Sequence, residues 1–467
     1  MIEKIAQASL YVHGFVLVRN GYLVTEAYFA PIAREHLHLL YSATKSVTSA
    51  LVGVAIQEGF IKGVNQKVLD FFPEMKAKNP DPHLGDLAIE HLLTMSTGQA
   101  FPVSPNPYQA APVDWVEQFL GNKTNTIVYE PGKPFLYTSG APHTLSAIIQ
   151  KTTGKTMADY AEKLFGPLGI TEYAWLADQN GISFGNSWLR LKPVDMARFG
   201  YLYLHHGDWN GRQVVPQAWV EKSTQKHMET KGTMWNTAEE DGYGYLWWMN
   251  SFGGYSAHGY GGQFIFVVPE SNLVAVFTGG FADPVFDTSY QLMKNYIIPA
   301  VKSNSPLAKN GPAYQALTAR VKHVGTQPAK PVPPLPDMAK RISGKTWRLA
   351  DGTTATLYFN ATAEYSLTMK PPIPYKGEKH TLEYRGGLDD GYRVNKSINS
   401  VYGPCLVGCK GYWQDDHIFV HMEYAMDTGA IRIARCSFEK DKLTLEISDE
   451  FSGTSTSSGT VIATLEE

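Results

Sequence analysis

Cysteine is scarce in this chain. Its 467 residues include only three, Cys405, Cys409 and Cys436, an odd number too small for a disulfide framework. Cys405 and Cys409 lie close enough in sequence to bridge or to share a metal ion. However, no second pair of cysteines or histidines has the spacing of a zinc site. We therefore expect structural or incidental roles for all three cysteines, and no metal or other cofactor.

The chain also has no long apolar run and no strong excess of positive or negative charge. No uninterrupted apolar run approaches the roughly 18 residues that a membrane span needs. The 41 Lys and Arg residues nearly balance the 44 Asp and Glu residues, and the two signs are interspersed. The absence of a basic patch argues against a nucleic-acid partner. The first seven residues lack the charged, apolar and cleavage-site order of a signal peptide. The sequence as written therefore indicates a cytoplasmic protein, or a periplasmic or secreted one whose leader has been trimmed.

The chain is long enough for two or three domains, and its 43% hydrophobic content is typical of globular proteins with sizeable cores. Two β-rich runs flank Asn20-Gly21, which is a strong hairpin signal. Helical patterns follow, and strand-like runs return before a last helix. The order predicts an α/β (α+β) domain over residues 1–305, with an antiparallel sheet and helices. Its predicted helices cover 87–98, 142–153, 157–164, 193–205 and 290–301, and its later strands cover 243–249, 255–268 and 273–278.

Residues 306–337 are predicted to form a helix and a linker, because five prolines between positions 328 and 336 favour a stiff, extended chain. Residues 338–467 are predicted to form an all-β, barrel-like (lipocalin-like) domain of short strands. Its serine- and threonine-rich stretch 451–460 is predicted to be a flexible loop. The expected strands are 354–359, 364–369, 381–384, 411–413, 417–423, 431–438, 442–447 and 461–465.

The stretch 41–50 is the most informative one. It has the pattern of a buried helix with Ser42 at its start, and Lys45 lies one turn further on the same face. A serine hydroxyl is a weak nucleophile that needs a base beside it, and a buried lysine with a lowered pKa can serve. A helix N-terminus adds partial positive charge where an oxyanion would form. Ser-x-x-Lys alone occurs by chance in most chains of this length, so other elements must support it.

Two further elements do so. Tyr137-Thr138-Ser139 lies in a turn-rich segment before a helix, and His258-Gly259-Tyr260 lies in a strand pattern followed by Gly261 and Gly262. Together with Ser42-Ala43-Thr44-Lys45, this order resembles the serine β-lactamase and penicillin-binding protein superfamily. The resemblance is closest to its class C-like branch, which includes family VIII carboxylesterases, D-aminopeptidases and 6-aminohexanoate-dimer hydrolase. It covers roughly residues 10 to 300, and the stretches 92–98, 166–170 and 195–200 look like the family's framework.

The resemblance implies catalytic roles. Ser42 attacks a carbonyl and is acylated, and Lys45 and Tyr137 share the work of the general base. Which of the two takes the proton is left open by the sequence. Tyr137 then protonates the leaving group and activates the deacylating water. The backbone N–H of Ser42 and that of Gly261 are the expected oxyanion donors.

His258 completes the expected catalytic set, and Ser139, Gly259, Tyr260 and Gly261 are the expected substrate-binding residues. Ser139 stands where many relatives have asparagine, and His258 where β-lactamases have a lysine that attracts the substrate carboxylate. Both departures favour an ester or an uncharged amide over a β-lactam. Ser139 also fits a turn former, and His258 a simple strand-end histidine. The aromatic residues that could line an acyl or aryl pocket are Tyr108, Trp188, Tyr243, Tyr245, Trp247, Trp248 and Tyr260.

The sequence thus predicts a serine hydrolase that cleaves a small-molecule ester or amide through an acyl-enzyme. The alternatives are a D-amino-acid peptidase or amidase, a β-lactamase, or a non-catalytic penicillin-binding-like module. A classical Ser-His-Asp hydrolase is disfavoured because no Gly-x-Ser-x-Gly occurs, and a metallohydrolase because no His-Glu-x-x-His occurs. The C-terminal domain could cap the pocket, form a homodimer or only add stability. We expect it to pack against the first domain, because the linker is short and stiff.

Overall fold

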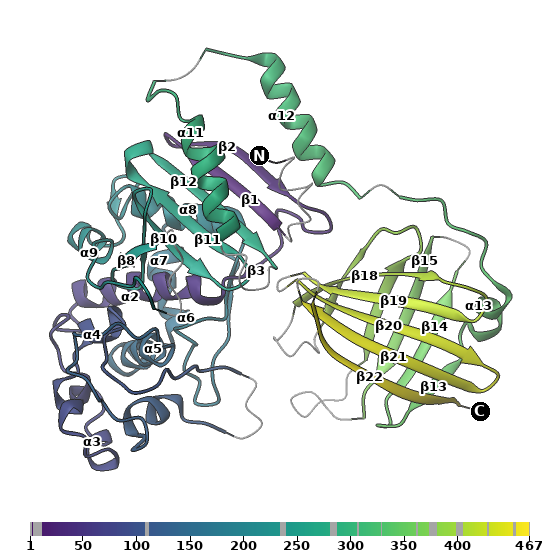
Figure 1. The fold of residues 1–467 in the computed structure, drawn as a ribbon, viewed down its shortest axis with the longest axis horizontal. Coiled ribbons are helices and arrows are strands. Elements are labelled where there is room, and N and C mark those ends of the chain that lie inside the picture. Colours follow the sequence, from purple (N-terminus) through teal and green to yellow (C-terminus); the bar gives the residue numbers. More distant parts are fainter. Residues whose placement is uncertain are drawn as a thin grey trace.

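The computed structural model describes Ile2 and the residue ranges 12–107, 112–233, 240–280, 287–305, 308–327, 329–360, 363–372, 381–397, 405–426, 429–451 and 454–466. A mixed domain of helices and strands precedes a separate β-barrel, and helix α12 (Gly311–Val324) with the segment after it connects the two (Figure 1). Within the described residues, no helix has the length and apolar character needed to cross a membrane.

The first domain is built on a seven-stranded antiparallel sheet. The predicted hairpin is confirmed, since Asn20 and Gly21 have φ of 50° and 79° between paired strands. The first strand also pairs with the last strand of the sheet, so both ends of the domain meet in one sheet, as expected. In sheet order the strands are β2 (Tyr22–Tyr28), β1 (Val12–Arg19), β12 (Leu273–Gly279), β11 (Gln263–Val268), β10 (Tyr255–Gly259), β9 (Trp248–Asn250) and β8 (Glu240–Tyr243).

Two strand predictions were wrong in the same way. The run 243–249 is not one strand, because the chain turns at residues 244–247 between β8 and β9. The run 255–268 is the hairpin of β10 and β11, and Gly261 and Gly262 adopt φ of 79° and 87° in its turn. Apolar and aromatic residues fill both faces of these buried strands, so the pattern hid the turns. As a consequence, His258 lies near the end of β10 and Tyr260 begins a turn.

Helices cover both faces of this sheet. Ile265 and Val267 point into the core under α2 (Thr44–Gln57), α5 (Gly140–Thr153) and α8 (Pro193–Leu204). Phe264 and Phe266 point into the opposite core, under α10 (Asp287–Leu292), a π-helix (Met293–Ile297) and α11 (Ile298–Ala300). This alternation follows from the two-residue repeat of a strand. The helix α2 is almost wholly buried, as its apolar sequence predicts.

Most predicted helices are present with small shifts at their ends. The predicted helix 87–98 was too long: only α4 (Ile89–Leu93) forms, because the chain turns at Met95, whose φ is 56°. The other described elements of this domain are β3 (His38–Leu39), α3 (Met75–Lys78), a π-helix (Glu117–Gly121), α6 (Met157–Tyr160), α7 (Glu162–Phe165), β4 (Ala174–Trp175), β5 (Leu189–Leu191), β6 (Asp208–Trp209), β7 (Arg212–Gln213), α9 (Gln217–Ser223) and the 3₁₀ helices Val68–Asp70, Pro82–Asp86 and Pro269–Ser271.

The C-terminal domain is a closed barrel. Its ring runs β16-β15-β14-β13-β22-β21-β20-β19-β18 and closes where β18 pairs with β16. The helix α13 (Asp337–Ile342) packs on the core at one end. The strands are β13 (Thr346–Leu349), β14 (Thr354–Phe359), β15 (Glu364–Lys370), β16 (Leu382–Gly387), β17 (Arg393–Ser397), β18 (Cys405–Trp413), β19 (Ile418–Ala425), β20 (Ala430–Glu439), β21 (Lys442–Phe451) and β22 (Thr454–Leu465).

The sequence missed β13 and β17, and the prediction of a flexible loop over 451–460 was wrong. β21 continues to Phe451, and β22 starts at Thr454 and pairs with it along the serine- and threonine-rich stretch. Threonine favours strands, although a run rich in serine and threonine has the polarity of a loop. The three cysteines are free thiols on barrel strands.

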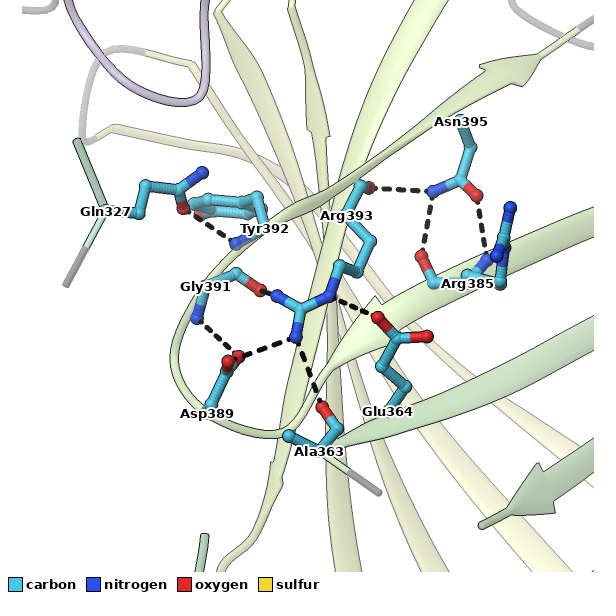
Figure 2. Close-up of polar contacts among 9 residues, drawn as sticks. All are labelled: Gln327, Ala363, Glu364, Arg385, Asp389, Gly391, Tyr392, Arg393 and Asn395. Carbon is cyan, nitrogen blue, oxygen red and sulfur yellow. Dashed lines mark hydrogen bonds and ion pairs between the residues drawn. The ribbon is translucent and has the colours of Figure 1, made fainter. Parts of the chain in front are cut away.

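The connecting segment is fastened to the barrel where β17 begins (Figure 2). Gln327 accepts a hydrogen bond of 2.7 Å from the backbone N–H of Tyr392. The neighbouring Arg393 bridges Glu364 and Asp389, at 2.7 and 3.0 Å. The Gln327 contact therefore restricts the linker close to the end of α12.

The barrel also packs against the first domain, as expected. The Tyr424 hydroxyl on β19 forms a hydrogen bond with Nε2 of His13 on β1, and Ile32 joins Tyr424 in a small apolar cluster. Gly429, just before β20, lies directly on Gly280, since a Cβ at Gly429 would be 2.6 Å from the Gly280 Cα. The end of the barrel opposite α13 therefore faces the first domain (Figure 1).

Candidate active site

Ser42 lies in a tight 3₁₀ turn, Tyr41–Ala43, directly before α2. Tyr41 adopts φ of 46°, a left-handed conformation that costs energy for a residue with a side chain and is common at functional sites. The serine is partly exposed at the N-terminus of a buried helix. This position combines access for a substrate with the positive end of the helix dipole.

Lys45 reaches back from the first turn of α2 to the serine. Its Nζ lies 2.9 Å from Oγ of Ser42 and 2.9 Å from the backbone oxygen of Asn186. The side chain is only 1% exposed, and burial lowers its pKa to about 7. Desolvation disfavours the ammonium form and so makes the neutral amine available near neutral pH. Lys45 thus has the position and the proton affinity of a general base.

Tyr137 approaches the same hydroxyl from the segment before α5. Its hydroxyl forms a hydrogen bond with Ser42, and Nζ of Lys45 lies 4.9 Å from the centroid of its ring. The ring stacks on Trp248. Burial raises the pKa of Tyr137, the bond with Ser42 lowers it, and the charge of Glu240 raises it further. The net shift is upward, so Tyr137 is a neutral phenol at neutral pH.

His258 forms another wall, near the end of β10. Its Nδ1 lies 3.0 Å from Oε1 of Glu240, and the Tyr290 hydroxyl donates to the same oxygen at 2.8 Å. The imidazole also stacks on Phe264, with the two ring planes inclined by 10°. A buried carboxylate and an aromatic plane therefore fix the orientation of this ring.

The glycine-rich turn after His258 fits tightly against the serine turn. A Cβ at Gly259 would lie 2.2 Å from the Leu40 backbone oxygen, so only glycine fits there. Gly261 lies beside Tyr41, since a Cβ on it would be 3.7 Å from Cε2 of that ring. The Tyr260 ring, 37% exposed, lies 5.5 Å from the Tyr41 ring. The structure thus brings the predicted glycines and Tyr260 to the serine.

Ser139 is the N-cap residue of α5, two positions after Tyr137, and its side chain makes no capping hydrogen bond. Of the predicted pocket aromatics, Trp188, Tyr243 and Trp248 adjoin the site residues through ring contacts. Tyr245 and Trp247 are fully buried in the core. Tyr108 lies outside the described residues.

Sequence reasoning missed two residues of this site. Asn186 accepts a hydrogen bond from Lys45 through its backbone oxygen, and a backbone contact of this kind leaves no pattern in the sequence. Its side-chain amide donates to the backbone oxygen of Pro105 at 3.1 Å. Glu240 precedes Asp241 and so has the appearance of a surface charge, yet its side chain is fully buried beside His258. Glu240 on β8 comes close to His258 on β10 only when the sheet forms, so the sequence alone does not reveal this contact.

Comparisons with known proteins agree with this geometry. The family model described as Beta-lactamase matches residues 6–287. The 6-aminohexanoate-dimer hydrolase of Paenarthrobacter ureafaciens is 26% identical over 287 residues, which cover 58% of this chain and 73% of that hydrolase.

Solved structures show the same fold. A structure from Bacillus anthracis, named provisionally as a 6-aminohexanoate-dimer hydrolase, superposes with a TM-score of 0.52 at 24% identity and covers 64% of this chain and 81% of its own. EstCE1, described as a hydrolase with promiscuous acyltransferase activity, gives a TM-score of 0.52 at 15% identity and covers 65% of this chain and 97% of its own. The expected superfamily and fold class are thereby confirmed, and the chain belongs to the beta-lactamase family.

Proposed function

We propose that this protein is a serine hydrolase that cleaves carboxylic esters through an acyl-enzyme on Ser42. One observation carries the proposal: a buried lysine with a pKa near 7 lies 2.9 Å from a partly exposed serine hydroxyl at a helix N-terminus. A lysine held for stability alone would keep its charge and an acidic partner. The arrangement fits nucleophile activation instead.

In acylation, the Ser42 oxygen bonds to the substrate carbonyl carbon while its proton passes to the neutral amine of Lys45. The backbone N–H groups of Ser42 and Gly261 stabilise the oxyanion. Tyr137 then donates its proton to the leaving alkoxide as the carbon–oxygen bond breaks, and the lysine ammonium returns a proton to the phenolate. The raised pKa of Tyr137 supports this division of roles, because a phenol that stays neutral is available as the acid.

Deacylation repeats the sequence with water as the nucleophile. Water bonds to the acyl carbon while its proton passes to the neutral amine of Lys45, and the lysine ammonium returns this proton to the Ser42 oxygen as the acyl bond breaks. The products are the alcohol, released first, and the carboxylic acid. His258 lines the site and helps to position the substrate.

Two features favour an ester over a substrate that carries a carboxylate. Nδ1 of His258 lies 3.0 Å from the Glu240 carboxyl group, so this wall offers an anionic substrate no unpaired cation such as the lysine of β-lactamases. Ser139 has a short hydroxyl where a carboxamide would hold an amide more firmly. A second candidate is an amide, which the named activity of the 26%-identical 6-aminohexanoate-dimer hydrolase supports.

The test compares the wild type with Ser42→Ala on p-nitrophenyl butyrate, nitrocefin and D-alanyl p-nitroanilide. We expect turnover of the ester, its loss in the variant, and little or no nitrocefin cleavage. Faster cleavage of the anilide than of the ester would support the amidase. Equal inactivity of both proteins on all three substrates would support a binding module, and turnover that survives Ser42→Ala would refute the mechanism.

A further inference from the structure

The C-terminal barrel is hollow. It encloses a cavity of about 750 Å³, which lies within the about 300–1,000 Å³ range of small-molecule pockets. At the end far from the first domain, Met338 and Ile342 of α13 belong to the core that closes it (Figure 1). Most of the side chains that line the cavity are apolar, including Leu357, Leu367, Met369, Leu382, Val407 and Leu445.

The open end of the cavity is lined by residues that adjoin the candidate active site. Three aromatic side chains of the first domain, Tyr41, Trp188 and Tyr260, line the same cavity as the barrel interior. Tyr41 immediately precedes the nucleophile Ser42, and its ring lies 6.3 Å from the Trp188 ring and 5.5 Å from the Tyr260 ring. The barrel lumen and the site around Ser42 therefore share an aromatic wall.

Four charged side chains line the cavity along one wall, and they are Glu423, Arg432, Asp449 and Glu450. Glu423, Arg432 and Asp449 lie side by side in register on β19, β20 and β21. Arg432 holds Asp449 through two bonds of 2.8 and 3.1 Å, and Nε2 of His421 lies 3.0 Å from Glu423. Carboxylates outnumber the arginine in this group, so the wall does not attract an anion. A neutral apolar chain fits the opposite wall, where β14 to β16 present leucine and methionine.

We propose that the barrel lumen binds the acyl chain of a long-chain ester whose carbonyl lies at Ser42. This inference rests on the proposed ester hydrolysis and specifies its substrate class. The aromatic wall guides the chain from the serine into the lumen, where burial of methylene groups stabilises it.

The first test measures binding without catalysis. The full-length Ser42→Ala protein is titrated with N-phenyl-1-naphthylamine, a neutral dye that fluoresces in apolar surroundings, and the dye is then displaced with ethyl dodecanoate or ethyl acetate. We expect saturable dye binding, displacement by the dodecanoate and none by the acetate. Absence of dye binding, or equal displacement by both esters, would overturn the inference even if the enzyme cleaves short esters.

The second test fills the lumen. Ala434 points inward on β20 and lines the cavity, whereas its neighbour Ile433 points to the outer face. Ala434→Phe is expected to weaken dye binding by about tenfold or more, and Ile433→Phe is the matched control that leaves it unchanged. Ala355→Phe fills the lumen from β14 and provides a second variant if Ala434→Phe does not fold. Dye binding that survives both lumen variants would place the dye elsewhere and refute the inference.

The third test asks whether chain binding in the lumen raises kcat/KM. For p-nitrophenyl esters from butyrate to dodecanoate, kcat/KM is expected to rise by about threefold to fourfold per buried methylene until the chain fills the lumen. Ala434→Phe should flatten this rise, and Ile433→Phe should retain it. A protein that binds dye and displaces it with the long ester but hydrolyses none would refute the proposed function while supporting the lumen as a chain-binding site. A flat chain-length profile in an active wild type would refute the lumen's role in catalysis.

Discussion

Nζ of Lys45 lies 2.9 Å from Oγ of Ser42, and burial brings the pKa of this amine to about 7. The two residues are one helical turn apart, so the spacing in the sequence alone places them on one face. What the fold adds is the removal of water around the lysine, which makes it a base at physiological pH.

The pH profile should report this lysine. Below pH 7 its ammonium form cannot accept the serine proton, so kcat/KM for p-nitrophenyl butyrate is expected to rise with pH and level off above an apparent pKa near 7. Tyr137→Phe should lower the plateau and keep the midpoint, because the titrating group remains. A midpoint that moves or vanishes in Tyr137→Phe would assign the base to the tyrosine instead.

The variant Lys45→Arg is a second test of whether Lys45 accepts the serine proton. Arginine stays protonated at all accessible pH values, so this variant should lose roughly 10²- to 10⁴-fold in kcat/KM. The surface exchange Lys151→Arg, on the half-exposed ion pair with Glu74, is the control that should have no effect. Activity of Lys45→Arg within about twofold of the wild type would show that Lys45 does not take the proton.

Tyr137 is expected to act mainly on the leaving group. An alkyl ester releases a strongly basic alkoxide that needs a proton, whereas p-nitrophenolate leaves as a stable anion. Tyr137→Phe should therefore slow hydrolysis of ethyl butyrate by roughly 10²- to 10⁴-fold and that of p-nitrophenyl butyrate by much less. Equal losses on both esters would indicate that the tyrosine instead orients Ser42.

Much of this site could be predicted from the sequence, because its parts are local. Ser42 and Lys45 share a helix turn, and Tyr137 precedes a helix whose glycine stop is visible in the sequence. Asn186 and Glu240 could not be predicted, since one acts through its backbone and the other is buried only by the sheet. The barrel strands β13 and β17 were missed although each pairs with the strand that follows it, because they have only 4 and 5 residues and too few apolar positions to show an alternating pattern.

Gly259 should tolerate no side chain. Because a Cβ there would lie 2.2 Å from the Leu40 backbone oxygen, Gly259→Ala must push β10 away from the turn that carries Ser42. We expect a loss of about 1–3 kcal/mol in stability and a loss of esterase activity. Gly85→Ala is the matched control, since a Cβ at Gly85 meets nothing within 4 Å. Both quantities can be followed by thermal unfolding and by p-nitrophenyl butyrate turnover, and wild-type values for Gly259→Ala would contradict the close approach.

The contact between the domains should weaken in acid. Burial, and then the neighbouring His38, lower the pKa of His13 well below its usual 6.5, and the Tyr424 hydroxyl of the barrel bonds to the same ring. The folded state therefore prefers neutral His13, so this contribution to stability is present above pH 6.5 and is lost as the pH falls below it, by up to about 1.4 kcal/mol per pH unit. His13→Gln cannot titrate, and its melting temperature should fall less than that of the wild type between pH 7.5 and pH 5. Parallel curves for the two proteins would show that His13 does not couple protonation to folding.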